Sequence, residues 1–165
     1  MNISVIGAGY VGLITGIGFA KLNHQVSIVD LNDDLIKNLN ENRPPFYEPE
    51  LVDYLNDSNI RNNLFFSTSY QKSINENTDI VFVCVQTPTD PDTGKTKTDY
   101  ISSVLTELKK IERFNFIICI KSTIKATLVE KISNEIDLDY KKIIFNPEFL
   151  SCLLYTSDAA DDRLR

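Results

Sequence analysis

The 165-residue chain has no tryptophan, one histidine and three cysteines. Cys84, Cys119 and Cys152 form neither a disulfide framework nor a metal-ligand cluster, so no metal site is expected. The formal net charge is −6 without a block of Lys and Arg, which argues against a nucleic-acid surface. No apolar run approaches the roughly 20 residues that span a bilayer, and the first residues are typical of a core strand rather than a signal peptide. These absences favour a cytoplasmic protein that binds neither nucleic acid nor membrane.

The composition, with 42% hydrophobic and 24% charged residues, suits one globular domain with a proper core. The last fourteen residues do not fit that domain, because residues 152–165 resemble the translation of a sequencing adapter. Segments of this kind are left out of fold reasoning. We therefore expect a domain over residues 1–151, a non-native tail over 152–165, and a natural protein that continues past Ser151.

The most informative pattern lies in the first thirty residues. Residues 2–6 predict a strand, residues 7–12 have the spacing Gly-x-Gly-x-x-Gly, and an apolar helical run follows. Residues 25–29 then predict a second strand, which ends at Asp30. A glycine pattern alone is weak evidence, but a strand before it, a helix after it and an acid at this distance are typical of a dinucleotide site.

Each glycine of this turn has a separate physical role. Gly7 permits the tight turn out of the strand, Gly9 lets a pyrophosphate approach the backbone, and Gly12 lets the helix pack against the sheet. The helix N-terminus then presents free N–H groups and a positive dipole end to the phosphates. The turn could also be purely structural, a Gly-rich bend that binds nothing.

Asp30 bears on the choice of cofactor. A carboxylate at this point accepts hydrogen bonds from the adenosine ribose hydroxyls and repels a ribose 2′-phosphate. Residues 31–36 contain no Lys or Arg that would attract such a phosphate. The sequence therefore predicts NAD rather than NADP.

The remaining chain alternates between strand and helix patterns. Strands are expected near 2–6, 25–29, 64–67, 79–85, 116–120 and 142–145, and helices after the glycine turn and near 33–39, 51–55, 101–111 and 128–136. Residues 43–49, with three prolines, and residues 86–98 are expected to be loops. This alternation predicts an α/β fold with a doubly wound, parallel, Rossmann-like sheet in a single domain.

Polar clusters follow several of the predicted strands. They are the glycine turn with Asp30, Thr87-Pro88-Thr89, Lys121-Ser122-Thr123 and Asn146-Pro147-Glu148. Ligands of such sheets bind outside the carboxyl ends of the strands, so all four clusters are expected at one edge. Threonine hydroxyls can contact carboxamide, phosphate or ribose oxygens, and a carboxylate can orient a water or act as a base. Any single cluster could also be a solvated loop or a helix cap.

These motifs, together with Tyr47-Glu48-Pro49-Glu50-Leu51, occur in an order that resembles the N-terminal NAD-binding domain of the UDP-glucose/GDP-mannose dehydrogenase family. The resemblance covers residues 1–151. It implies an enzyme that oxidises the terminal alcohol of a nucleotide sugar to a carboxylate in two steps with two NAD⁺. UDP-glucose is the expected substrate, UDP-glucuronate the product, and the full-length enzyme is expected to be a homo-oligomer.

The resemblance also implies roles for individual positions. Those matched to the cofactor site are Gly7, Gly9, Tyr10, Val11, Gly12, Asp30, Thr87, Thr89 and Thr123. Thr123 and Glu148 are matched to the reaction centre. The nucleophilic cysteine of the family belongs to a later domain, and Cys84 and Cys119 are expected inside strands, where a thiol is inert. We therefore expect this chain to bind NAD⁺ without turning over.

Three alternatives remain open. GDP-mannose or an N-acetylated UDP-sugar could replace UDP-glucose as the substrate. A dehydrogenase of the same superfamily could act on a hydroxyacyl or phosphosugar substrate, against which Tyr47-Glu48-Pro49 argues mildly. An NAD-sensing regulatory module also opens with Gly-x-Gly-x-x-Gly, but it gives no reason for the other motifs.

Overall fold

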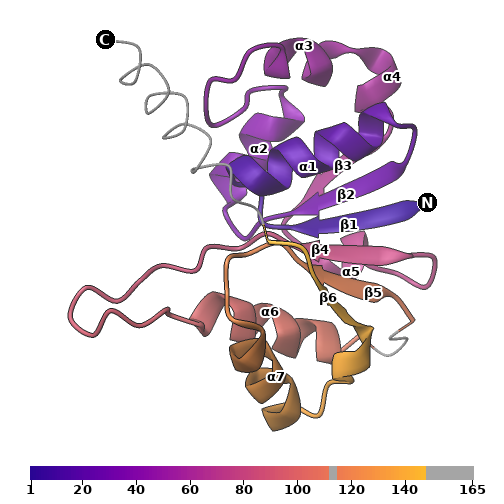
Figure 1. The fold of residues 1–165 in the computed structure, drawn as a ribbon. Coiled ribbons are helices and arrows are strands. Elements are labelled where there is room, and N and C mark those ends of the chain that lie inside the picture. Colours follow the sequence, from indigo (N-terminus) through magenta and orange to yellow (C-terminus); the bar gives the residue numbers. More distant parts are fainter. Residues whose placement is uncertain (112–114, 148–165) are drawn as a thin grey trace, which may run out of the picture.

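The computed structural model describes residues 1–111 and 115–147. Within these ranges six parallel strands form one sheet in the order β3-β2-β1-β4-β5-β6 (Figure 1). The strands are β1 (Asn2–Ile6), β2 (Gln25–Val29), β3 (Leu64–Ser67), β4 (Ile80–Val83), β5 (Ile117–Ile120) and β6 (Ile143–Phe145). This confirms the expected doubly wound, Rossmann-like α/β fold, and the strand order reverses between β1 and β4.

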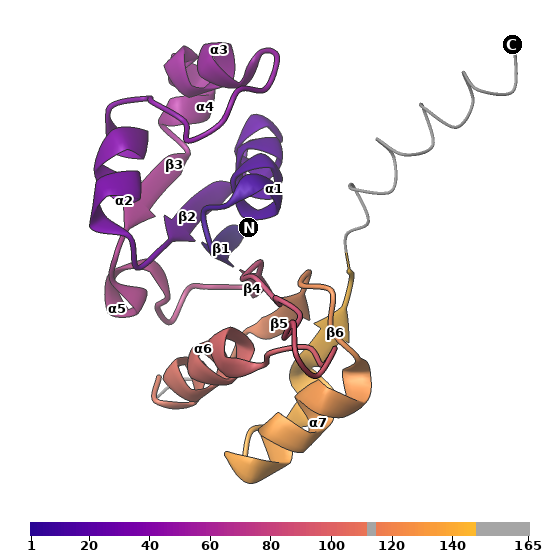
Figure 2. The same cartoon turned by 90° about the vertical axis from the view of Figure 1, so that its left-hand side faces the viewer.

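Helices cover both faces of the sheet, as Figures 1 and 2 show. One face carries α1 (Tyr10–Lys21), α2 (Asp33–Asn40), α3 (Leu51–Asn56) and α4 (Ser58–Arg61). The other carries α5 (Tyr70–Ser73), α6 (Asp99–Lys109), α7 (Ala126–Glu135) and the short 3₁₀ helix η1 (Tyr140–Lys142). Each layer buries its own apolar cluster against the sheet, so the central strands are apolar on both sides.

The β1–α1–β2 unit forms for reasons that are visible in its sequence. Ile3 and Val5 of β1 face the α1 side, and Ile6 faces the opposite side, as the period of two in a strand requires. In α1, Leu13 and Ile17 are buried four residues apart on the face that meets the sheet. This packing fixes the N-terminus of α1 above the carboxyl ends of β1 and β4.

Some element boundaries differ from the expectation. The strand expected over 79–85 ends at Val83, because Gly7 turns away from the sheet and leaves the residues after Cys84 without a ladder partner on β1. The short helices α4, α5 and η1 were not expected, and η1 takes Lys142 out of the last strand. The expected loop over 86–98 is closed by a bridge between Thr89 and Thr96. Glu148 and the 152–165 tail lie outside the described residues.

Candidate cofactor site

Two hollows lie side by side at the carboxyl edge of the sheet. The first, about 360 Å³, lies between β2, β4 and α6 and contains Asp30. The second, about 250 Å³, lies between α1, β4 and β5 and contains Thr87 and Thr123. Both are lined by Gly9 and by residues 84–86, so they meet at the glycine turn where the strand order reverses. An extended ligand could occupy both.

Two glycines of the turn are required by the protein itself. Gly7 has φ +97°, and a Cβ added there would lie 2.7 Å from the Cys84 carbonyl oxygen. A Cβ added at Gly12 would lie 1.9 Å from the Gly7 carbonyl oxygen. Backbone atoms cannot give way as side chains can, so both positions need glycine for the fold alone.

Gly9 is different, because nothing in the protein demands a glycine there. Its backbone is extended (φ −70°, ψ −172°), and a Cβ added at this position would meet no atom within 4 Å. Gly9 caps α1, whose first-turn N–H groups point out of the helix end. A side chain at Gly9 would enter the space where the two hollows meet, so its absence fits the close approach of an anionic group such as a pyrophosphate.

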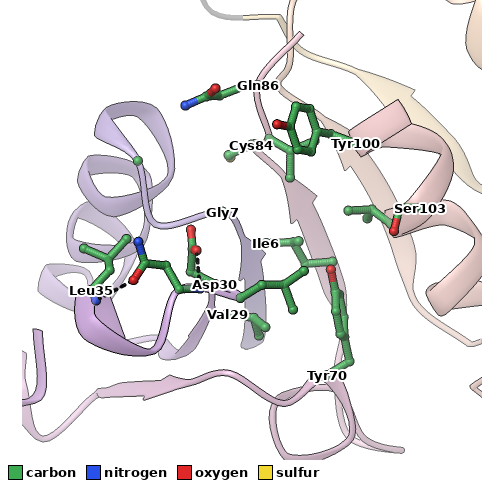
Figure 3. A pocket seen from close by; sticks show the side chains of 15 residues that line it. Ile6, Gly7, Val29, Asp30, Leu35, Tyr70, Cys84, Gln86, Tyr100 and Ser103 are labelled. Carbon is green, nitrogen blue, oxygen red and sulfur yellow. Dashed lines mark hydrogen bonds between the residues drawn. The ribbon is translucent and has the colours of Figure 1, made fainter. Parts of the chain in front are cut away.

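The Asp30 carboxylate is held by the backbone around it (Figure 3). One carboxylate oxygen accepts from the Ala8 N–H at 2.8 Å, and the other accepts from the Asn32 N–H at 3.0 Å. Each oxygen retains a lone pair for a further donor, which suits ribose hydroxyls. The residues that line the first hollow, Leu31 and Leu35 among them, include no Lys or Arg that would receive a 2′-phosphate.

The first hollow also has walls that sequence reasoning missed. Tyr70 on α5, together with Tyr100 and Ser103 on α6, faces Asp30 across the hollow (Figure 3). Tyr70 is half-buried, and burial raises its pKa, with the charges of Glu107 and Asp30 adding to the effect. A neutral phenol beside aliphatic side chains suits a purine. No local pattern could have marked these residues, because only the fold brings them to Asp30.

The second hollow brings together most of the remaining predicted residues. Tyr10 and Val11 line it from α1, and Thr87 and Thr123 line it from the other side. The Thr87 hydroxyl donates to the Thr123 carbonyl oxygen at 3.0 Å, which joins the loops that follow β4 and β5. Thr89 is exposed at the base of the 89–96 hairpin and lines neither hollow. Its contact with the cofactor stays a prediction, as does that of Glu148.

The expectation that Cys84 lies inside a strand is wrong. It follows the last residue of β4 and lines both hollows. Burial raises the pKa of the Cys84 thiol to about 12, although the nearby Lys121 charge acts in the opposite direction. Burial also raises the pKa of Cys119, which lies within β5 as expected. Both thiols therefore stay protonated near neutral pH and are poor nucleophiles.

Two kinds of feature are absent from the described ranges, residues 1–111 and 115–147. No three His, Cys, Asp or Glu side chains within them gather closely enough to hold a metal ion. None of the helices described is long and apolar enough to cross a bilayer.

Fold and site together define the cofactor domain of an NAD-dependent oxidoreductase. The chain belongs to the UDP-glucose/GDP-mannose dehydrogenase family, because the model of that family's NAD binding domain matches residues 1–161.

Curated relatives agree with this assignment. UDP-glucose 6-dehydrogenase YwqF of Bacillus subtilis is 30% identical over 158 residues, which cover 91% of this chain and 35% of the relative. The UDP-glucose 6-dehydrogenase of Rickettsia typhi is 33% identical over 157 residues, which cover 91% of this chain and 35% of the relative. A Methanocaldococcus jannaschii protein is 37% identical over 153 residues, which cover 91% of this chain and 16% of that protein.

Solved structures show the same relationship. GDP-mannose dehydrogenase from Pseudomonas aeruginosa superimposes with a TM-score of 0.79 at 26% identity, over 90% of this chain and 36% of that one. UDP-glucose dehydrogenase from Pyrobaculum islandicum gives a TM-score of 0.73 at 30% identity, over 89% of this chain and 35% of that one. The chain thus spans about a third of the length of these dehydrogenases.

Proposed function

We propose that this chain is the NAD-binding part of a nucleotide-sugar 6-dehydrogenase that oxidises UDP-glucose to UDP-glucuronate with two NAD⁺. The observation that carries the proposal is Gly9, a glycine that the fold does not need, at the point where two hollows meet. UDP-glucose is preferred over other sugars because several curated relatives are UDP-glucose 6-dehydrogenases at 30% identity or more.

Each of the two hollows would hold a different half of the cofactor. Asp30 would bind the adenosine ribose in the first hollow, and Gly7, Gly9 and Gly12 shape the turn whose amides would hold the pyrophosphate. The nicotinamide half would then lie in the second hollow, near the four residues Tyr10, Val11, Thr87 and Thr123. Thr89 follows Thr87 by two residues, and its contact with the cofactor stays a proposal. Bound there, NAD⁺ supplies a hydride acceptor for the sugar alcohol.

The reaction centre is proposed at the outer side of this second hollow. Thr123 is exposed there, where its hydroxyl can donate to a substrate oxygen. The ladder between β5 and β6 extends to Asn146, whose N–H donates to the Ile120 carbonyl oxygen at 2.9 Å. Glu148 follows Asn146 by two residues in the sequence, and it is proposed to orient a water or to accept a proton.

The domain by itself is proposed to bind NAD⁺ without oxidising a sugar. The family uses a thiolate from a later domain, and Cys84 and Cys119 are held in their protonated form. We further propose that residues 1–151 form the native domain, that residues 152–165 do not belong to it, and that the full-length enzyme is a cytoplasmic homo-oligomer.

A second candidate substrate, GDP-mannose, is favoured by one observation. The GDP-mannose dehydrogenase of Pseudomonas aeruginosa has a higher TM-score, 0.79, than the UDP-glucose dehydrogenase of Pyrobaculum islandicum, 0.73. N-acetylated UDP-sugars form a third candidate class. A regulatory NAD sensor is a further alternative of a different kind, and it predicts binding with no oxidation of any sugar.

A chimera tests the proposal. Residues 1–147 of this chain replace the matching segment of the Bacillus subtilis enzyme, and NADH formation is followed with UDP-glucose, GDP-mannose and UDP-N-acetylmannosamine. The expected result is oxidation of UDP-glucose with two NADH formed per sugar, while the 165-residue chain alone binds NAD⁺ and forms no NADH. One NADH per sugar, or binding without turnover in a folded chimera, would contradict the proposal.

A further inference from the structure

Tyr10 is held in place by a segment outside its own helix. Tyr10 is the first residue of α1, is 43% exposed and lines the second hollow next to Gly9. Its hydroxyl donates to the Glu48 carboxylate at 2.9 Å. Its ring lies against Phe46, with 4.9 Å between the ring centroids. The direction in which this ring points is therefore set by the residues around Glu48.

That segment, residues 43–50, is itself firmly fixed. Three of its eight residues are prolines, which lock their φ angles. Phe46 packs against the core cluster on the α1 side of the sheet, and Leu51, directly after the segment, is 1% exposed. A rigid segment can impose an orientation on Tyr10, whereas a flexible one could not.

A second attachment lies at the other end of α1. The Lys21 ammonium donates to the Tyr54 hydroxyl at 3.1 Å and lies 4.3 Å from the centre of that ring. Tyr54 in turn donates to the Glu50 carboxylate. The stretch from Phe46 to Tyr54 is thus bound to the first and the last residue of α1.

We propose that Glu48 is a positioning residue that fixes the Tyr10 ring as a wall of the second hollow and so strengthens binding of the nicotinamide half of NAD⁺. The inference rests on the proposed function, because it takes the nicotinamide half to lie in that hollow. Without the Glu48 acceptor, the Tyr10 side chain regains rotamer freedom, and ligand binding must order it again.

The contact between Glu48 and Tyr10 has two components, a hydrogen bond and the carboxylate charge. The hydrogen bond to Glu48 raises the pKa of Tyr10, and burial and the carboxylate charge act in the same direction. A tyrosine phenol is neutral near pH 7 even without this shift, so the proposed effect of Glu48 lies in the orientation of the ring. Glu48→Gln keeps an acceptor for the hydroxyl and removes the charge, so it separates these two effects.

Calorimetry on the 165-residue chain tests the proposal, with NAD⁺ and ADP-ribose as the two ligands. ADP-ribose retains the adenosine, the pyrophosphate and the second ribose and lacks only the nicotinamide ring, so the pair of ligands reports on contacts with that ring. Glu48→Ala and Tyr10→Phe are each expected to weaken NAD⁺ binding by about threefold to tenfold, the range that one lost hydrogen bond gives. ADP-ribose affinity should change by less than about twofold, and Glu48→Gln should restore most of the NAD⁺ affinity.

The double variant and one control complete the design. If Glu48 acts through Tyr10, the double variant binds NAD⁺ no more weakly than the single variant that has the larger loss of affinity. Tyr47→Ala is the control, because Tyr47 precedes Glu48, is 90% exposed and lines neither hollow. Thermal unfolding of every variant excludes loss of the fold as the cause of weaker binding.

Several outcomes would overturn the inference. Additive losses in the double variant, equal losses for ADP-ribose and NAD⁺, or unchanged NAD⁺ affinity in Glu48→Ala would each do so. A wild-type chain that binds neither ligand would refute the proposed function itself. A wild-type chain that binds both, with no effect of Glu48→Ala, would remove only the role of Glu48.

Discussion

The two hollows are built in different ways. Asp30, which lines the first hollow, and the glycine turn come from one short stretch of chain, and backbone N–H groups orient the acid. The second hollow collects residues from α1 and from the loops after β4 and β5, and bonds such as Thr87 to Thr123 hold it together. The contrast teaches that local sequence determines Asp30 and the glycine turn, whereas tertiary packing determines the second hollow.

The largest expected effect concerns a glycine that the fold requires. Gly12→Ala places a Cβ 1.9 Å from the Gly7 carbonyl oxygen, so α1 must move away from the turn. We expect the free energy of unfolding to fall by about 3 kcal/mol, measured by urea denaturation. Gly18→Ala is the control, because Gly18 lies in the same helix and a Cβ added there would meet no atom within 4 Å. This substitution should raise the free energy of unfolding by as much as about 1 kcal/mol. Equal effects at the two positions would contradict the steric argument.

The second prediction concerns Gly9, where a substitution should weaken NAD⁺ binding and leave stability almost unchanged. Gly9→Ala adds a methyl group where no protein atom lies within 4 Å, so the free energy of unfolding should change by less than about 0.5 kcal/mol. The same methyl group would keep the pyrophosphate from the helix end, and NAD⁺ affinity should fall by about tenfold or more in calorimetry. Unchanged NAD⁺ affinity would mean that the ligand does not pass Gly9.

The third prediction tests the first hollow alone. Asp30→Asn removes the charge that favours ribose hydroxyls, so NAD⁺ affinity should fall by about tenfold, while NADP⁺ affinity should stay constant or rise. Asp33→Asn is the control, because Asp33 begins α2 and does not line the hollow. Equal affinity of the wild-type chain for NAD⁺ and NADP⁺ would show that Asp30 does not select the cofactor.

The smallest effect is expected in the segment that holds Tyr10. Glu50 has φ +65°, a conformation that costs a side chain about 1 kcal/mol and costs glycine little. Glu50→Gly should raise the free energy of unfolding by about 0.5 kcal/mol, since the exposed bond from Tyr54 is lost at the same time. Asn23→Gly, at φ +63°, is the comparison and should gain less, because asparagine tolerates this region. A loss of stability in Glu50→Gly would show that the Tyr54 bond outweighs the strain.

The sequence predicted the fold well where a pattern is long and local. The β1–α1–β2 unit, Asp30 and the parallel sheet follow from hydrophobic period and glycine spacing. Helices of three or four residues, such as α5, are too short to show a period, and strand β4 ends where its neighbour β1 turns away, which its own residues do not encode.

The site shows the same limit. The position of Thr87 and Thr123 at the same edge of the sheet could be predicted, because each follows a strand and parallel strands end at one edge. Tyr70, Tyr100 and the bond between Glu48 and Tyr10 could not, because they depend on how distant segments meet. Cys84 looked like a strand residue because its apolar neighbours hide the point at which β4 stops.

The two N–H bonds to Asp30 have a consequence for the thermodynamics of recognition. Together with the bond from the Gly7 N–H to the Val29 carbonyl oxygen at 2.7 Å, they tie the turn to β2 through the chain's own contacts. A loop secured in this way has little configurational freedom to surrender when a dinucleotide docks. The heat-capacity change on docking should therefore reflect the surface that becomes covered, without the larger signature of a segment that folds around its ligand.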